Sequence, residues 1–257
     1  MANRRRIVAD LGNSRLKWAL VGLDGFLTGS IALPVDDPDA WAVAFGDCAL
    51  SSQDVWAIST VNPPVADRLA RFLSDQRVST IRWYRSAAEV PINHDVEGPE
   101  TGGADRALAV LAAKEFHAPD RPGLVVSCGT AITVERISAD GVWQGGAIAP
   151  GLGLSARALH QLTAQLPQIN VPEAPTPWGR GTEAALAAGL FWGSVGAVRE
   201  LLNRQAEGLS PLPWVDWTGG DAARLAPWID WPGSRVVPDL VLLGLARAAF
   251  FNESPVS

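Results

Sequence analysis

The sequence has 257 residues, of which 47% are hydrophobic and 19% are charged, and its formal net charge is −6. This composition predicts a packed globular chain with one large domain or two medium ones, and it excludes long disordered segments. The acidic balance also excludes a general nucleic-acid binder, because such proteins carry a basic face.

The N-terminal stretch, MANRRRIVADLG, is basic but lacks the apolar core of a signal peptide. The longest apolar stretches are interrupted by Gly, Pro or charged residues before the roughly 18 residues that a membrane span needs. The two cysteines, Cys48 and Cys128, lack the spacing of a disulfide framework or a zinc site. We therefore expect no membrane segment and a reducing, cytoplasmic location.

The first predicted structure is a β-meander in DLGNSRLKWALVGLDGFLTGSIALP, which starts at Asp10. Gly12 in its first turn would expose backbone N–H groups as an anion nest, and Asn13 and Ser14 could bind phosphate oxygens. Asp10 beside the turn fits a magnesium position, since carboxylates and phosphates together hold Mg²⁺. Lys17 is either a phosphate contact or a surface lysine.

Further along the chain we expect a helix near Asp39–Ala49, a strand in VWAIST, a helix in PPVADRLARFLSD and a strand in STIRWYR. The segment from Ala87 to Gly102 is rich in Pro, Gly, Asn and Asp, which predicts a linker before a helix that begins near Ala104. This places an N-terminal domain at residues 1–100 and a C-terminal domain at 101–257.

The predicted helix in ETGGADRALAVLAAKE begins with Asp105 and Arg106. A phosphoryl-transfer enzyme needs one carboxylate to orient or deprotonate the attacking hydroxyl, and a guanidinium binds an acceptor carboxylate through two hydrogen bonds. An acid at a helix start is equally explained by the helix dipole. The sequence leaves both explanations open.

A second β-meander, SCGTAITVERISADGVWQGGAIAP, starts at Ser127 and can be superposed on the first. Gly129 then matches Gly12, and Ser127 matches Asp10. The repeat predicts two related domains whose glycine turns meet across a cleft and hold a polyphosphate from both sides.

The remaining elements expected are a helix in GLSARALHQLTAQL, a long helix from about Thr182 to Asn203, a strand in LPWVDWTGG and a last helix in PDLVLLGLARAAFF. The TGG triplet, Thr218 to Gly220, stands between a strand and a short helix. It is either an adenosine contact, where glycines let a flat ring approach, or a tight turn.

Six motifs together resemble the type III pantothenate kinases, also described as a Bvg accessory factor type, from about Arg6 to about Ala249. They are DLGNSRLKWAL, GGADRALA, GTAITVE with DGVWQGGAIAPGL, WGRGTEAALAAGL, TGG and PDLVLLGL. The resemblance implies an α/β chain with the duplicated two-domain fold of acetate and sugar kinases, heat-shock ATPases and actin, with mixed β-sheets flanked by helices. It also implies a homodimer that transfers the ATP γ-phosphate, with Mg²⁺, to pantothenate in coenzyme A synthesis.

The resemblance also implies roles for individual residues. Asp105 would be the general base. The ATP contacts would be Asp10, Leu11, Gly12, Asn13, Ser14, Arg15, Leu16, Lys17, Gly129, Thr130, Thr218, Gly219 and Gly220. The pantothenate contacts would be Gly103, Ala104, Asp105, Arg106, Thr182 and the position of Val96.

Three positions depart from the family pattern. Ser127 replaces an aspartate that is implied to bind K⁺ or NH₄⁺, Val96 replaces a tyrosine that helps to hold pantothenate, and Glu135 replaces a common aspartate. These changes leave three hypotheses: an active kinase with a relaxed monovalent-cation requirement, a nucleotide-binding regulatory relative without catalysis, and a kinase for another small hydroxy acid or amide.

Overall fold

The computed structural model describes residues 4–251 and divides the chain into two compact units. Unit 1 contains the chain up to Phe116 and again from Asp239 onward, and unit 2 spans His117–Pro238. This division differs from the boundary expected after residue 100. Helix α3 (Ala104–Lys114) belongs to unit 1, because its buried alanine and leucine face packs against α7 (Leu240–Ala246).

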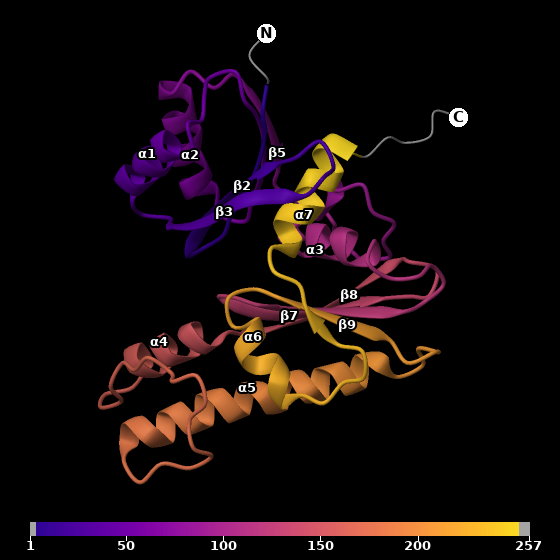
Figure 1. Ribbon diagram of the computed structural model, residues 1–257. Helices are drawn as coiled ribbons and strands as arrows, with labels where there is room; N and C mark the ends of the chain where they lie inside the picture. The colour runs from indigo at the N-terminus through magenta and orange to yellow at the C-terminus, as the bar shows by residue number, and fades with distance from the viewer. Residues whose placement is uncertain (1–3, 252–257) are drawn as a thin grey trace. The chain divides into compact units, whose positions relative to one another are not determined.

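The five-stranded sheet of unit 1 has the order β3-β2-β1-β4-β5, with the first three strands antiparallel and the last two parallel to β1 (Figure 1). The predicted first β-meander is thus confirmed. Its strands are β1 (Arg6–Leu11), β2 (Arg15–Val21), β3 (Leu27–Pro34), β4 (Val55–Thr60) and β5 (Thr80–Tyr84).

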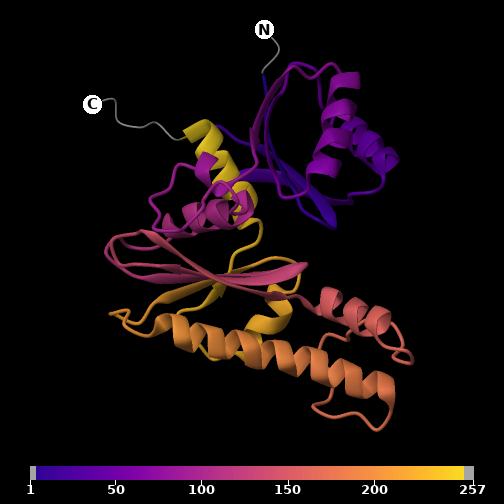
Figure 2. The ribbon, with the colours of Figure 1, turned by 180° about the vertical axis from the view of Figure 1, so that it is seen from behind.

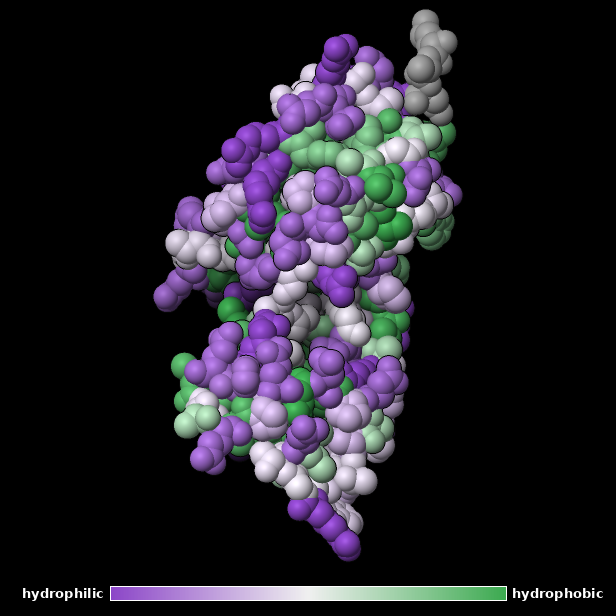
Figure 3. All heavy atoms as spheres, turned by 90° about the vertical axis from the view of Figure 1, so that its left-hand side faces the viewer, coloured by the Kyte–Doolittle hydropathy of each residue, from purple (hydrophilic) through white to green (hydrophobic). Residues whose placement is uncertain are grey.

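Helices α1 (Pro38–Asp47) and α2 (Pro63–Asp75) cover one face of this sheet. Alternate strand residues, Ile7, Ala9 and Leu11 among them, enter the core beneath these helices, while the residues between them face the other way. Hydrophilic residues predominate on the outer surface of these helices, as Figure 3 shows. Asp10 therefore lies on the face opposite to α1 and α2, where α3 and α7 contact the strands.

The segment before α3 folds back on itself within unit 1. It contains a 3₁₀ turn, η1 (Ala87–Glu89), and the N–H of Ala87 donates to the carbonyl of Gly102 at 2.8 Å. A loop rich in Pro and Gly has the same composition whether it links two domains or folds back within one. The sequence therefore could not distinguish a linker from this folded loop.

Unit 2 repeats the plan of unit 1, with the strand order β10-β9-β6-β7-β8. The second predicted β-meander is confirmed as β6, β7 and β8, and helix α5 runs along one face of the sheet (Figure 2). The strands are β6 (Gly123–Cys128), β7 (Ala131–Ile137), β8 (Trp143–Pro150), β9 (Trp214–Thr218) and β10 (Arg235–Val236). The helices are α4 (Leu152–Leu162), α5 (Thr182–Ala206), α6 (Ala222–Leu225) and the 3₁₀ turn η2 (Ala226–Trp228).

Strand register supports the internal repeat residue by residue. Asp10 lies opposite Lys17 on β2 and Ser59 on β4, and Ser127 lies opposite Thr133 on β7 and Thr218 on β9. The charged pair of unit 1 is therefore replaced in unit 2 by Ser127 and Thr133, and all three corresponding residues there carry neutral hydroxyl groups. The repeat also confirms that Ser127 occupies the place that Asp10 has in unit 1.

Helix α5 is long and apolar enough, by length and composition alone, to cross a membrane. It buries Phe191, Val195 and Val198 against the sheet of unit 2, as a core helix of a soluble protein does. Only 33% of its most apolar window is buried, however. Its outer side exposes small residues, Ala185, Gly189, Gly193, Gly196 and Ala197 among them.

The fully buried side chain of Asp216 on β9 contacts residues near both ends of unit 2. Its Oδ1 accepts a hydrogen bond from Nε of Arg235 at 2.7 Å, and its Oδ2 lies 3.0 Å from Nε2 of His117, whose ring stacks on Trp214. Burial lowers the pKa of His117 below its usual value, against the pull of the carboxylate. Since His117 begins unit 2 and Arg235 lies near its end, this carboxylate links the first and last segments of the unit.

We expect Asp216→Asn to lower the free energy of unfolding by roughly 2 kcal/mol. The variant removes the buried negative charge that pairs with the half-exposed guanidinium of Arg235. Urea denaturation would measure the change. Glu200→Gln, which breaks the exposed ion pair with Arg204, is the control and should leave the midpoint unchanged. Equal midpoints for wild type and Asp216→Asn would contradict the structural role of this carboxylate.

Candidate active site

In unit 1, an acidic cluster forms at the end of β1 around Asp10. Oγ of Ser59 donates a hydrogen bond to Oδ1 of Asp10 at 2.7 Å. Burial raises the pKa of Asp10 to about 6, and repulsion from Asp105 and Asp239 adds to this, whereas the Ser59 hydrogen bond and Lys17 oppose it. The charges that act on Asp10 thus come from Lys17 on the next strand and from Asp105 and Asp239, which are far from it in the sequence.

The start of α3 turns the carboxylate of Asp105 back over its own loop. Oδ1 of Asp105 accepts a hydrogen bond from the backbone N–H of Arg106 at 2.9 Å, and Gly103 is the N-cap. A Cβ atom at Gly103 would lie 2.4 Å from that oxygen, so a larger residue there would require the side chain of Asp105 to shift. Asp105 does lie in the first helical turn, and its charge also acts on Asp10. The helix-dipole explanation and the catalytic one therefore both remain open for Asp105.

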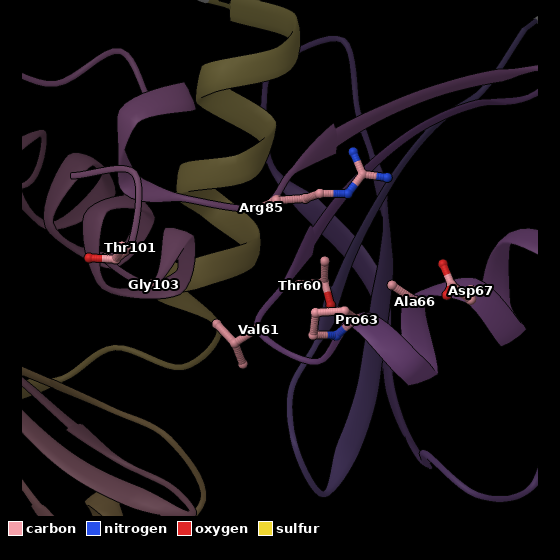
Figure 4. Close-up of a pocket in the computed structure, with 9 residues that line it drawn as sticks. Thr60, Val61, Pro63, Ala66, Asp67, Arg85, Thr101 and Gly103 are labelled. Atoms are coloured by element: carbon pink, nitrogen blue, oxygen red, sulfur yellow. The ribbon is translucent and has the colours of Figure 1, made fainter. Parts of the chain in front are cut away.

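A cavity of about 210 Å³ in unit 1 adjoins this loop. Figure 4 shows Arg85 extending into the space between Val61 and Gly103 on one side and Pro63 and Ala66 of α2 on the other. The lining residues are Thr60, Val61, Pro63, Ala66, Asp67, Arg85, Thr101, Gly102 and Gly103.

The guanidinium of Arg85 stacks over the ring of Trp83 and forms no ion pair among residues 4–251. A guanidinium without a carboxylate partner can bind an acidic group that enters the cavity. The cavity is therefore suited to a small hydroxy acid whose hydroxyl is near the loop of Asp105.

The glycine turns differ from the expected anion nests in one respect. The N–H of Gly12 donates to the carbonyl of Arg15, and the N–H of Gly129 donates to the carbonyl of Ala131, both at 3.0 Å, so these amides close the turns. Neither glycine has a positive φ, and an added Cβ would make only ordinary contacts, at 3.6 and 3.8 Å. The local fold does not require glycine at either position.

In unit 2, the TGG segment and the start of α4 lie against the second glycine turn. Gly219 has a φ of +93°, and a Cβ there would lie 2.4 Å from the carbonyl oxygen of Cys128, so the tight-turn explanation holds for Gly219. Gly220 has open space where a Cβ would be, which leaves room for a ligand. Gly151, the N-cap of α4, approaches the carbonyl oxygen of Gly129 closely, with a Cβ position 2.2 Å away.

Of the other predicted residues, Ser127 pairs with Thr218 in the register of β6 and β9, whereas Thr182 and Val96 lie apart from these two clusters. Ser127 is half-buried within β6, Thr182 is exposed at the first position of α5, and Val96 is half-buried in the loop before α3 without lining the cavity. Of the predicted residues, those gathered in unit 1 are Asp10, Lys17, Gly103 and Asp105. Those gathered in unit 2 are Gly129, Thr130, Thr218, Gly219 and Gly220.

Sequence reasoning missed Ser59 and Asp239. Ser59 follows the apolar run of β4, and only the parallel register of β4 with β1 shows that it reaches Asp10. Asp239 stands in the PDLVLLGL motif, to which the sequence analysis gave no role.

Two units with the same meander, each bearing residues that could contact phosphate, define the class as the two-domain fold of actin-like ATPases and sugar kinases. Two solved structures share this fold. They are a propionate kinase from Francisella tularensis (TM-score 0.54, 11% identity, 96% of this chain and 99% of that one) and a protein described as a Baf family transcriptional activator from Campylobacter jejuni (TM-score 0.58, 21% identity, 94% and 96%).

The sequence comparisons are more specific than the fold. Residues 6–204 match the profile of the type III pantothenate kinase family. The type III pantothenate kinase of Chromobacterium violaceum is 38% identical over 95% of this chain and 99% of its own length. The chain belongs to the type III pantothenate kinase family.

Proposed function

We propose that this chain transfers the γ-phosphate of ATP to the hydroxyl of pantothenate and so forms 4′-phosphopantothenate, the first step of coenzyme A biosynthesis. Family membership over nearly the whole chain supports the reaction. The observation that carries the catalytic assignment is the proximity of Asp10 and Asp105 beside the loop that lines the cavity. A phosphoryl-transfer site needs both a cation-binding carboxylate and a hydroxyl-orienting one.

In this proposal, Asp105 accepts the proton of the attacking hydroxyl, and the cavity beside Gly102 and Gly103 holds the body of pantothenate. Arg106 and Arg85 are the guanidinium groups proposed to contact its carboxylate. Thr182 and Val96 are proposed as acceptor contacts from the resemblance to the family alone, since neither lines this cavity. The residues proposed for ATP are Asp10 to Lys17 in unit 1 and Gly129, Thr130 and Thr218 to Gly220 in unit 2.

The residues around Asp10 fit a divalent cation. Burial raises the pKa of Asp10 first and the charges of Asp105 and Asp239 add to this, and a bound Mg²⁺ would offset the cost of ionising the carboxyl group. Asp10 would hold the ion as its one protein carboxylate together with the phosphates of ATP. When bound, Mg²⁺ neutralises charge that develops on the β- and γ-phosphate oxygens.

The monovalent-cation site of the family fits this chain less well. At the position of its usual aspartate, Ser127 is flanked by Thr133 and Thr218, so the strands present neutral hydroxyl groups. Hydroxyl oxygens can bind K⁺ weakly but supply no negative charge. We therefore propose catalysis with a relaxed requirement for K⁺ or NH₄⁺.

A coupled ADP-release assay with pantothenate in K⁺, NH₄⁺ and Na⁺ buffers tests both statements. We expect turnover in all three buffers, with rates that differ by only a few-fold. Turnover confined to K⁺ and NH₄⁺ would contradict the relaxed requirement. A folded protein that binds ATP but phosphorylates no pantothenate in any buffer would contradict the kinase proposal. It would favour instead a nucleotide-binding regulatory relative, which Ser127 and Val96 also suggest, or another hydroxy acid or amide as acceptor, which a panel of acceptors would reveal.

A cytoplasmic homodimer is part of the same proposal. The outer side of α5 supports it, because exposed alanine and glycine residues let a second helix approach closely.

A further inference from the structure

Asp239 occupies an unusual position in the chain. It is the first residue of unit 1 after the long excursion through unit 2, and it immediately precedes α7. Its backbone is left-handed, with φ 59° and ψ 27°, a conformation that Asp and Asn tolerate better than other residues with side chains. This backbone conformation fixes the direction in which the side chain of Asp239 leaves the main chain.

Helix α7 fixes this geometry relative to the first phosphate loop. Gly244 packs directly on the backbone of α3, since a Cβ there would lie 2.0 Å from the carbonyl oxygen of Leu108. The same helix contacts β1, β2 and β4. Asp239 is thus held by a helix that packs on the strands carrying Asp10 and Lys17.

The carboxylate of Asp239 faces Lys17. Nζ of Lys17 lies 3.8 Å from Oδ1 of Asp239, and the two side chains are 31% and 25% exposed. Lys17 stands directly opposite Asp10 in the antiparallel register of β1 and β2. The ammonium group thus faces the carboxylate of Asp239, and its charge also acts on Asp10, the residue opposite Lys17 in the strand register.

A pair of this kind contributes little to stability. The separation exceeds hydrogen-bond distance and both side chains are partly in water, so the free energy of unfolding should hardly depend on it. Its effect is instead on where the long, flexible lysine side chain spends its time. Without Asp239, the ammonium group would be free to leave the phosphate loop for solvent.

We propose that Asp239 is a positioning residue that keeps the ammonium group of Lys17 beside Asp10, oriented toward the phosphate chain of bound nucleotide. The inference rests on the proposed function, since it takes the first glycine turn as a phosphate loop. It gives the PDLVLLGL motif a role beyond packing, because Asp239 in this motif would hold Lys17 where it can contact phosphate.

Asp239→Asn tests the proposal, because asparagine has the same shape and tolerates the left-handed backbone but carries no charge. We expect the Kd for MgATP, measured by calorimetry, to rise about tenfold, and the KM for ATP to rise with it, while the KM for pantothenate and the melting temperature stay unchanged. Asp120→Asn is the matched control, because Asp120 is also left-handed, with φ 63°, but is exposed in unit 2.

A double-mutant cycle shows whether Asp239 acts through Lys17. In a Lys17→Met background, Asp239→Asn should have no further effect on the Kd for MgATP. An equal effect in both backgrounds, no effect in either, or tighter binding by Asp239→Asn would overturn the proposal. Binding is measured apart from transfer, so a protein that binds ATP without phosphorylating pantothenate would refute the kinase assignment and leave this cycle readable. A wild type that does not bind ATP would refute both.

Discussion

Asp105→Asn is expected to lower kcat for pantothenate phosphorylation by about 10²- to 10⁴-fold and to leave the Kd for ATP nearly unchanged. The asparagine side chain retains an oxygen that can accept the hydrogen bond from the Arg106 N–H, so the start of α3 should stay folded. It cannot accept a proton from the attacking hydroxyl. The loss should therefore appear in the chemical step rather than in nucleotide binding.

Single-turnover phosphorylation and ATP calorimetry on the same preparation separate these two effects. Asp39→Asn is the matched control, because Asp39 is also an acid in the first turn of a helix, α1, but is exposed on the other face of the sheet. Its kcat should equal that of wild type. If Asp105→Asn turned over pantothenate at the wild-type rate, Asp105 would have no part in the mechanism.

Asp10→Asn is expected to stabilise the apo protein at neutral pH and to abolish Mg²⁺-dependent ATP binding. Burial and the neighbouring carboxylates raise the pKa of Asp10 from 3.8 to about 6. Well below its unfolded-state pKa of 3.8, the group is protonated in both the folded and the unfolded state and does not affect stability. Above pH 6 it is ionised in both states, and the folded state is then penalised, because the charge is buried near Asp105 and Asp239.

The sign of the pH dependence follows from this. As pH rises from about 4 to about 6, this group makes the wild type progressively less stable, and the neutral asparagine removes that loss. Since one pKa unit corresponds to about 1.4 kcal/mol, we expect Asp10→Asn to be more stable than wild type by roughly 3 kcal/mol at pH 7.5.

Urea unfolding of both proteins between pH 4 and pH 8 would show the difference growing up to pH 6 and then levelling. A difference that is independent of pH, or a variant that is less stable at pH 7.5, would contradict the raised pKa. Added MgATP should stabilise the wild type only. Stabilisation of Asp10→Asn by MgATP to the same extent would remove Asp10 from the cation site.

Local signals were sufficient for most elements of the fold. Helix α2 spans the predicted PPVADRLARFLSD, because Asn62 caps it, two prolines follow, and its apolar residues recur at helical spacing. Helix α4 is shorter than predicted and ends at Leu162, since Thr163 is extended and Pro167 follows closely. The boundary between the two units lies after Phe116 and not after residue 100, and no comparable local signal distinguished the two places.

By itself, the sequence determined the duplicated meander, the two glycine turns and the acid at the start of α3, because each depends on neighbours within a few residues of the chain. Only the tertiary structure decided which side chains meet. Ser59 reaches Asp10 through strand register, and Asp239 reaches Lys17 because α7 returns to the unit in which the chain began. Contacts between residues so far apart depend on the packing of whole helices and strands, and packing of that kind leaves no periodic or compositional trace in the residues that it brings together.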